Sequence, residues 1–378
     1  MATLGPNAGL IGQPGSRARL CTPALVLDLD AFEHNVAAMA RFCGERGVAL
    51  RPHAKSHKSV AIARRQLEAG AIGISVATIG EAERLSDGGI GPLLITSPLV
   101  TTPKLERLAA LHRRTRGLIV VADNVAAVDA LAVAVEEAEE PLSVLVDLDM
   151  GRGRTGCADV AAARDLARRI AASDRLRFAG IQAYAGQLQH VADFEERRKA
   201  AALAARRVED LVERLVADHL PPAIVSGAGT GTHAIDAKLA FTELQCGSYI
   251  FVDVDYARVA LRADAAQPFA PALFVRSSVI SANHPDHVTT DAGTKAFATD
   301  GPLPVIADGA PAGATYRFAG DEHGRVEMQD AARHLPVGTA LECLTPHCDP
   351  TVNLYDHYHV VRDDTLIDIW PVDARGAF

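Results

Sequence analysis

The feature of this chain that most constrains its fold is a regular alternation of short apolar segments and amphipathic segments across residues 48–250. The amphipathic segments carry apolar residues at helical spacing, for example Leu105, Leu108 and Leu111. Short apolar strands that alternate with such helices indicate a parallel sheet covered on both faces. We expect eight strands, at residues 48–51, 73–77, 92–96, 117–122, 142–149, 178–184, 223–227 and 243–250.

Eight strand–helix units in about 200 residues predict a (β/α)8 barrel. A doubly wound open sheet is the alternative, but no GxGxxG motif opens a helix after the first strand. Ahead of the barrel strands, residues 23–28 have the pattern of a strand. Residues 31–46 have the pattern of a helix, with Phe32, Val36 and Met39 on one face.

The pattern changes near residue 256, where helical spacing ends and short β-type runs separated by Gly, Pro and Asp begin. These runs predict a second, mostly antiparallel β domain. They lie at residues 274–280, 287–291, 316–318, 339–344 and 359–362. We therefore expect a flexible tail at 1–20, a barrel at 21–255 and a β domain at 256–378, which the strand at 23–28 can join.

Composition narrows the class of protein. The 378 residues carry a formal net charge of −9 and no long basic run, which argues against a nucleic-acid partner. Six cysteines are scattered without a CxxC pair, which suits a reducing compartment. No apolar run is long enough to cross a bilayer, and no signal peptide is evident. These observations predict a cytoplasmic protein without a membrane partner.

Lys55 is the first candidate for chemistry. It follows the first barrel strand, which Pro52 ends, so its side chain is expected at the mouth of the barrel. Partial burial there lowers the pKa of a lysine and makes its amine a Schiff-base nucleophile. The alternative is an ordinary solvated loop rich in Lys and His.

Two loops rich in Gly, Ser and Thr point to an anion. Residues 226–231 follow the seventh strand, and residues 245–249 come late in the eighth. Barrel active sites lie at the C-terminal ends of the strands, and these last two loops commonly bind a phosphate. Small residues let backbone N–H groups approach the anion. One such loop is usually a simple turn, but two on one rim beside a reactive lysine suggest pyridoxal 5′-phosphate.

The motifs together resemble the family of D-threonine aldolases, 3-hydroxy-D-aspartate aldolases and D-serine dehydratases. These are metal-activated pyridoxal-phosphate enzymes with the alanine-racemase fold (fold type III). The resemblance covers nearly the whole chain, and six motifs occur in the order of the family. They lie at residues 51–58, 151–156, 182–186, 226–231, 243–249 and 346–351.

The resemblance implies a cofactor site. Lys55 would form the Schiff base, and Lys58 is the less favoured lysine, expected to support the loop. Arg154 would approach the phenolic oxygen of the cofactor and Tyr184 would stack on its ring. The residues expected to hold the phosphate and the rest of the cofactor are Gly229, Thr230, Gly247, Ser248 and Tyr249. Gln245 stands where the related racemases have an arginine facing the pyridine nitrogen, and the protonation of that nitrogen is left open.

A second cluster, His347-Cys348-Asp349, suggests a metal site. In an extended segment the side chains at positions i and i+2 point the same way, so His347 and Asp349 would converge. An imidazole and a carboxylate suit Mn²⁺ or Mg²⁺ first, and Co²⁺ or Zn²⁺ as alternatives. The pair coincides with the metal pair of the resembling family. Its dehydratases tend to have Cys at the second ligand position, so Asp349 favours an aldolase.

The resemblance also implies a reaction and a base. A D-3-hydroxy-α-amino acid, D-threonine or 3-hydroxy-D-aspartate, would be cleaved to glycine and an aldehyde or glyoxylate, with His190 as the base at the β-hydroxyl. The family members are homodimers. A dehydratase, a racemase and a non-catalytic pyridoxal-phosphate carrier are the alternatives. Arg152, Lys295 or a residue of a partner chain could bind a distal carboxylate of the substrate. The remaining histidines considered are expected to be structural: His53, His57, His284, His357 and His359.

Overall fold

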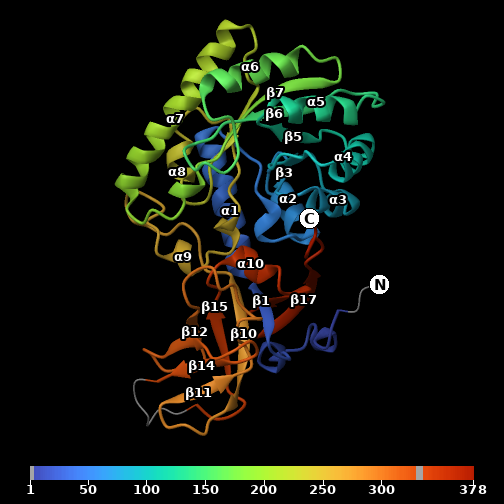
Figure 1. Cartoon of the computed structure of the whole chain (residues 1–378). Helices are drawn as coiled ribbons and strands as arrows, with labels where there is room; N and C mark the ends of the chain where they lie inside the picture. Colours follow the sequence, from blue (N-terminus) through green and yellow to red (C-terminus); the bar gives the residue numbers. More distant parts are fainter. Residues whose placement is uncertain (1–3, 329–334) are drawn as a thin grey trace.

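The structure is a computed structural model that describes residues 4–328 and 335–378. It has two parts (Figure 1): a parallel sheet surrounded by helices in the upper half of the view, and a mostly antiparallel β domain in the lower half. The short helix α10 (Cys348–Val352) lies at the junction of the two parts (Figure 1).

The parallel sheet has eight strands in the spatial order β2-β9-β8-β7-β6-β5-β4-β3. The sheet curls so that its ends meet: Leu50 O accepts from Ile72 N, and Pro52 O accepts from Ser75 N, both at 2.9 Å. The predicted (β/α)8 barrel is therefore confirmed. Its strands are β2 (Ala49–Leu50), β3 (Ile74–Val76), β4 (Leu93–Ile95), β5 (Ile119–Ala122), β6 (Leu142–Asp147), β7 (Leu176–Ala183), β8 (Ile224–Gly227) and β9 (Glu243–Leu244).

Five of the barrel helices begin where a polar side chain caps the first turn. Asp28 accepts from Ala31 N at the start of the first helix, and Asp193 accepts from Glu196 N at the start of the longest one. The helices of the barrel are α1 (Leu29–Arg46), α2 (Val60–Glu68), α3 (Ile79–Asp87), α4 (Thr102–Arg114), α5 (Val125–Ala134), α6 (Val160–Ala171), α7 (Phe194–Ala217) and α8 (His233–Asp236). The predicted apolar face of α1 is buried in the main hydrophobic core, as amphipathic spacing requires.

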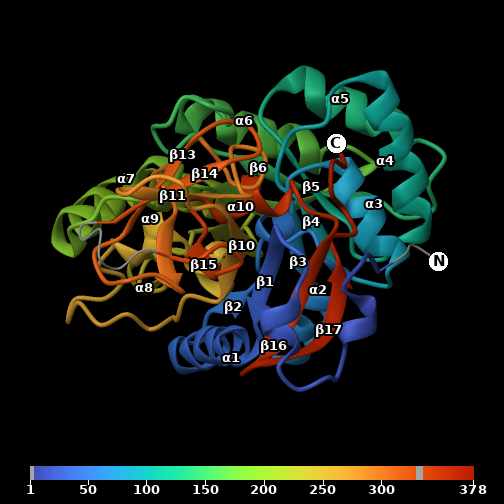
Figure 2. The ribbon, with the colours of Figure 1, turned by 90° about the horizontal axis from the view of Figure 1, so that it is seen from below.

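The β domain is one nine-stranded sheet, with β13-β14-β11-β10-β1-β16-β17 in order and β15 joining β10 to β12. The N-terminal strand β1 lies between β10, to which it is antiparallel, and β16, to which it is parallel. Figure 2 shows β1, β16 and β17 side by side from below. The strands are β1 (Ala24–Asp28), β10 (Leu273–Ser281), β11 (His287–Thr290), β12 (Val305–Asp308), β13 (Thr315–Phe318), β14 (Gly324–Glu327), β15 (Ala340–Leu344), β16 (His357–Arg362) and β17 (Thr365–Pro371).

Residues 4–20, where the sequence predicts a flexible tail, contact the β domain. They contain two short 3-10 helices, at Ala8–Leu10 and Ser16–Arg19. Arg17 Nε donates to Glu342 Oε1 at 2.9 Å, and Gly12 N donates to Leu366 O at 2.8 Å. These bonds attach the segment to β15 and β17. Residues 1–3 lie outside the described part of the chain.

Two predicted strands are interrupted. The strand expected at 243–250 ends after Leu244, and a 3-10 helix at Ser248–Ile250 follows it. The segment expected to be extended around residue 348 is instead helix α10, for which His347 is the N-cap. The first departure lies at the cavity described below, and the second lies next to it, where Asp349 contacts the cavity residue Lys55. Within the described residues, no helix combines the length and apolarity that crossing a membrane requires.

Candidate active site

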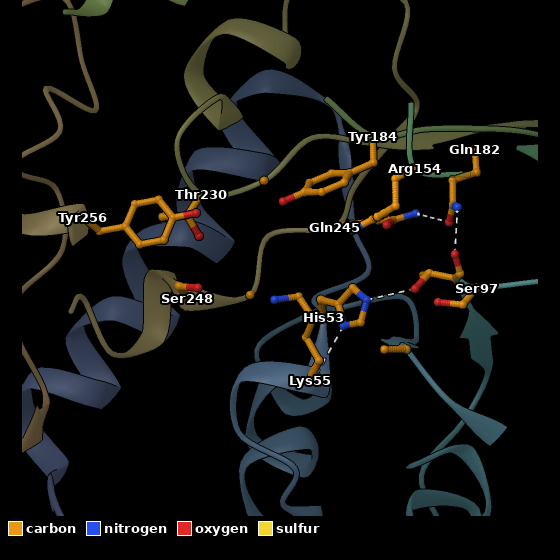
Figure 3. A pocket seen from close by; sticks show the side chains of 14 residues that line it. His53, Lys55, Ser97, Arg154, Gln182, Tyr184, Thr230, Gln245, Ser248 and Tyr256 are labelled. Carbon is orange, nitrogen blue, oxygen red and sulfur yellow. Dashed lines mark hydrogen bonds between the residues drawn. The ribbon is translucent and has the colours of Figure 1, made fainter. Parts of the chain in front are cut away.

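A cavity opens at the C-terminal ends of the barrel strands. Its wall is drawn from the ends of seven of the eight strands, all but β5, with the segments that follow them, and from the short helix α9 (Val254–Ala257). Its mixture of polar groups suits a small organic ligand. The lining residues are His53, Lys55, Ala77, Thr96, Ser97, Arg154, Gln182, Tyr184, Gly229, Thr230, Gln245, Gly247, Ser248 and Tyr256 (Figure 3).

Lys55 reaches this cavity from a single 3-10 turn, Ala54–Ser56, directly after β2. His53 caps that turn by accepting from Lys55 N at 3.2 Å, which fixes the direction of the lysine. The Nζ atom of Lys55 donates to Asp349 Oδ2 on α10. A lysine of the barrel is thus paired with a carboxylate of the β domain.

This pairing corrects the expected pKa of Lys55. Burial lowers the pKa, as predicted, but the Asp349 carboxylate more than offsets it, so the pKa of Lys55 is raised overall. The same pairing holds the pKa of Asp349 at about 2, against the opposing effect of burial. In this arrangement Lys55 is a cation, and it must lose a proton before it can act as a nucleophile.

The phosphate-type loop after β8 has an unfilled hydrogen-bonding position. Thr230 lines the cavity, and its buried Oγ1 has no hydrogen-bond partner within the described chain. Gly229 leaves no room for a side chain, because a Cβ there would lie 2.3 Å from Gln189 Oε1. Across the cavity, a Cβ on Gly247 would lie 3.0 Å from His53 O. The unpartnered hydroxyl and the two close-approaching glycines fit an anionic ligand.

Two further side chains converge as predicted from sequence. The guanidinium carbon of Arg154 lies 5.7 Å from the centroid of the Tyr184 ring. Both side chains line the cavity (Figure 3), and burial raises the pKa of Tyr184, which keeps its hydroxyl protonated. Gln245 also lines the cavity, where it bonds to Gln182 and Ser226.

Tyr249 and His190 do not line the cavity. Tyr249 is fully buried, accepts from Gln66 Nε2 at 3.0 Å and packs on Phe269, so it belongs to the core beneath the loop. His190 lies behind Tyr256, with ring centroids 4.6 Å apart, and its side chain is 45% exposed. Its Nδ1 is 3.9 Å from Asp255 Oδ2. Tyr256 therefore separates His190 from the cavity in this conformation.

The predicted metal pair meets at α10, but not in an extended segment. His347 is the N-cap and Asp349 is in the first turn of the helix, and the two side chains are near enough for His347 to lower the pKa of Asp349. Across residues 4–328 and 335–378, no three His, Cys, Asp or Glu side chains are grouped as a metal site. The pair can therefore supply two ligands, with the remaining positions left to water or substrate.

His347 has a hydrogen bond that suits a ligand role. Its Nδ1 lies 2.9 Å from Asp300 Oδ2. A carboxylate behind a histidine orients the ring and leaves Nε2 for an ion, which is the usual arrangement around metal-bound histidines. Cys348, between the two ligands, has a fully buried thiol whose pKa burial raises well above the ordinary value. That thiol is a poor ligand because metals bind the thiolate.

Asp253 connects the two parts of the site. Its Oδ1 accepts from Tyr256 N and its Oδ2 accepts from Cys348 N, both at 3.0 Å, and the residue is fully buried. One carboxylate thus caps α9, which carries the cavity residue Tyr256, and also anchors the start of α10. The sequence analysis missed this residue because no local pattern shows which backbone amides a carboxylate will cap.

Other cavity residues were also missed. His53 was expected to be structural, yet it lines the cavity and its Nε2 lies 3.0 Å from Thr96 Oγ1. Burial holds the pKa of His53 well below its ordinary value, so its ring is neutral. Its position two residues before Lys55 was the available signal. Thr96, Ser97 and Tyr256 had none, because they lie in segments without a recognisable motif.

Three other residues considered from the sequence do not line the cavity. Lys58 donates to Glu81 at 2.8 Å and to Ala374 O, which is the supporting role expected of it. Lys295 pairs with Glu322 in the β domain. Arg152 lies at the rim beside Tyr184: a Cβ on Gly186 would be 2.4 Å from its Nη1 and 2.9 Å from Tyr184 Cε1.

Comparison with known proteins gives this site its family. The alanine racemase N-terminal domain matches residues 27–255, and a putative serine dehydratase domain matches residues 272–361. The 3-hydroxy-D-aspartate aldolase of Paracoccus denitrificans (strain Pd 1222) is 36% identical over 96% of this chain and 94% of its own length. The chain therefore belongs to the family of aldolases that carry the alanine racemase N-terminal domain. The predicted family and the alanine-racemase-like fold are both confirmed.

Two aldolases that bear another name support the same assignment. The D-threonine aldolase of an Arthrobacter species is 39% identical over 96% of this chain and 95% of its own length. The crystal structure of D-threonine aldolase from Filomicrobium marinum superposes with a TM-score of 0.91 at 39% identity, covering 95% of this chain and 96% of that one. The D-threo-3-hydroxyaspartate dehydratase of a Delftia species is more distant, at 29% identity. The chain is therefore an enzyme of the carbon–carbon lyase class.

Proposed function

We propose that this enzyme is an aldolase that uses pyridoxal 5′-phosphate and a divalent metal to cleave D-3-hydroxy-α-amino acids to glycine and an aldehyde or glyoxylate. The observation that carries the proposal is the contact between Lys55, a cavity residue of the barrel, and Asp349 of the β domain. Its aldolase relatives support an amino acid as the small-molecule substrate.

The cavity fits the cofactor. The unpartnered Oγ1 of Thr230, together with the backbone at Gly229, Gly247 and Ser248, offers hydrogen bonds to a phosphate. Lys55 is within reach of the same space, and Arg154 and Tyr184 border it. Pyridoxal phosphate bound here supplies an electron sink for the negative charge that develops at Cα.

The pair on α10 fits a divalent ion. His347 Nε2 and the carboxylate of Asp349 would hold it, and Asp300 would keep the imidazole oriented. This donor set favours Mn²⁺ or Mg²⁺, with Co²⁺ or Zn²⁺ as alternatives. Such an ion supplies Lewis acidity that lowers the pKa of a hydroxyl.

The residues of the chain then divide the work. Lys55 would hold the cofactor, and its amine would be free once a substrate amine had taken its place. His347 and Asp349 position the β-hydroxyl of the substrate, and His190 accepts its proton. Because Tyr256 separates His190 from the cavity, that proton reaches His190 through a water molecule or after the half-exposed ring turns inward.

A dehydratase is the second candidate, because relatives of that activity share the fold. The second ligand position favours the aldolase: Asp349 stands where the resembling dehydratases tend to have Cys, and the neighbouring Cys348 is buried as a thiol. A racemase would leave the His347–Asp349 pair without a role. A non-catalytic carrier of pyridoxal phosphate would leave the side chains that the β domain brings to the site without a role.

Product analysis tests the proposal. The purified protein, reconstituted with pyridoxal phosphate, is incubated with D-threonine or with 3-hydroxy-D-aspartate, with and without EDTA. We expect glycine with acetaldehyde or glyoxylate, loss of turnover with EDTA and recovery on addition of Mn²⁺. Ammonia with a keto acid would identify a dehydratase, and turnover that resists EDTA would contradict the metal role.

The remaining parts of the proposal concern setting. We propose a cytoplasmic homodimer, with no nucleic-acid or membrane partner, on the basis of composition, the absence of CxxC pairs and the family resemblance. Sedimentation of the purified protein at micromolar concentration tests the dimer: a single species at the mass of one chain would contradict it.

A further inference from the structure

Four buried polar groups form a chain of hydrogen bonds that ends at the cavity. Gln182, at the end of β7, donates from Nε2 to Asp147 Oδ1 and to Thr96 O, both at 3.0 Å. Gln245, after β9, donates from Nε2 to Gln182 Oε1 at 3.3 Å and to Ser226 Oγ at 2.8 Å. Gln182 and Gln245 are only 3% and 5% exposed. Figure 3 shows the Gln245 amide pointing toward Gln182.

This chain fixes which atom of each amide is which. Thr96 O is a backbone carbonyl and can only accept, so the atom of Gln182 that faces it must be the NH2 group. Gln182 therefore presents Oε1 to Gln245, and the atom of Gln245 that meets it must also be an NH2 group. Amide orientations are assigned from such networks, and here an obligate acceptor determines both.

Gln245 consequently has a single group left for a ligand. Both of its N–H bonds are used, on Gln182 and Ser226, whereas its Oε1 receives no hydrogen bond from any described residue. Gln245 lines the cavity. The amide therefore offers the cavity an acceptor and no donor.

We propose that Gln245 accepts a hydrogen bond from the ring nitrogen of bound pyridoxal phosphate, so that this nitrogen carries a proton. The inference rests on the proposed function. In the cofactor the ring nitrogen lies opposite the carbon that bears the aldehyde. If Lys55 held the aldehyde and Thr230 the phosphate, the ring nitrogen would lie on the side of the ring away from Lys55, and Gln245 and Gln182, which line the same cavity, would be the amides available to it.

Arg154 is the competing neighbour. A guanidinium can only donate, so it would require an unprotonated nitrogen. Its Cζ lies 5.7 Å from the centroid of the Tyr184 ring, and no hydrogen bond joins it to Gln182 or Gln245, so the amide pair is held without it. Gln182 and Asp147 are positioning residues in this proposal, because their hydrogen bonds fix which way the Gln245 amide faces.

The proton has a chemical consequence. A protonated ring withdraws electrons more strongly than a neutral one, and hydrogen bonds to ring nitrogens are one way in which a protein sets the electronics of a cofactor. Cleavage of the Cα–Cβ bond leaves its electron pair on Cα, and the protonated ring stabilises that charge. The aldehyde leaves with the carbonyl formed from the β-hydroxyl, whose proton goes to the base, and Cα is reprotonated to give glycine.

The test is nitrogen NMR of the full-length protein reconstituted with pyridoxal phosphate labelled with ¹⁵N in the ring. We expect the wild-type resonance at the upfield, pyridinium position, with no change from neutral to mildly alkaline pH. Gln245→Glu, which keeps an acceptor, should leave the resonance there. Gln245→Arg, which supplies only donors, should move it downfield to the position of an unprotonated ring.

Gln182→Met is the variant that isolates the positioning role. It frees Gln245 to rotate, so we expect its resonance to move downfield as the pH rises, unlike that of the wild type. A wild-type resonance at the unprotonated position, or the same resonance in Gln245→Glu and Gln245→Arg, would overturn the inference. Borohydride reduction of the same samples keeps this test separate from the proposed function: a pyridoxyl label on Lys55 with an unprotonated ring refutes only the role of Gln245.

Discussion

The two sides of the active site are built in different ways. The barrel side is a buried, mutually bonded wall: Gln182 and Gln245 are almost inaccessible, and the cavity residue Thr230 has a buried hydroxyl with no hydrogen-bond partner among the described residues. The α10 side presents two partly exposed side chains, held by Asp300, Lys55 and the anchor at Asp253. The difference suggests that holding the cofactor and activating the β-hydroxyl are separate tasks, which substitutions can remove one at a time.

The largest effect is expected on the barrel side. Lys55→Ala should lower kcat by more than about 10⁴-fold, because it removes the group that holds and releases the cofactor. Steady-state assay of glycine formation measures it. The matched control is Lys58→Met combined with Glu81→Gln, which removes a structural ion pair together and should keep activity within a few-fold. Equal losses in the two proteins would mean that the wrong lysine has been assigned.

His347→Ala tests the α10 side. It should lower kcat by about 10²–10³-fold, a loss comparable to removing one group that stabilises developing charge. The visible absorption of bound cofactor should be unchanged, and Mn²⁺ affinity, measured by electron paramagnetic resonance, should fall. Cys348→Ala is the neighbouring control, since its buried thiol is not a ligand, and it should bind Mn²⁺ as the wild type does. Loss of the cofactor in His347→Ala would show that the two sides are not separable.

Arg152→Met examines the rim between the two sides. The side chain lies beside Tyr184, so we propose it as the cation that meets a distal carboxylate of the substrate. We expect kcat/KM for 3-hydroxy-D-aspartate to fall about tenfold, which corresponds to about 1.4 kcal/mol, with D-threonine nearly unaffected. Lys295→Met, far from the cavity and paired with Glu322, should change neither. A parallel loss with both substrates would remove Arg152 as a specificity residue.

The smallest effect concerns stability beneath the Thr230 loop. His233 is buried with Nδ1 2.8 Å from Thr230 O, and burial lowers its pKa to about 4. The pKa of His233 is lower in the folded chain than in the unfolded chain. At a pH between the two values, the unfolded chain binds a proton at this histidine and the folded chain does not. Stability is therefore lost as the pH falls below about 6.5, by about 1.4 kcal/mol per pH unit for each such histidine.

His233→Asn should remove that one proton from the pH dependence. Urea denaturation at neutral pH and at about one unit below the unfolded histidine pKa gives the change in the free energy of unfolding with pH, once for the wild type and once for the variant. His57, whose pKa burial lowers to about 3, should keep its own contribution in both proteins. An unchanged slope would mean that His233 is not held neutral.

The same contrast explains what the sequence could predict. The barrel residues follow a repeating pattern, so the end of each strand, and with it Lys55, Tyr184, Thr230 and Gln245, could be located from hydrophobic spacing and glycine-rich loops. The α10 residues were found through a motif, but their geometry was predicted wrongly, because a five-residue helix leaves no periodic signal.

Interactions between distant segments were beyond the sequence. The raised pKa of Lys55 depends on Asp349, 294 positions away, and nothing local to either residue reveals that they meet. Tyr249 was misplaced for a related reason. The chain turns into a 3-10 helix after Gly247, which sends Tyr249 into the core while Ser248 stays at the cavity.

The most direct test of the account is chemical trapping of the cofactor. Protein reconstituted with pyridoxal phosphate is reduced with borohydride, digested and mapped by mass spectrometry, before and after treatment with EDTA. The account predicts a pyridoxyl group on Lys55 in both samples, because the barrel side holds the cofactor without the ion. A label on Lys58, or no label on either lysine, would contradict it.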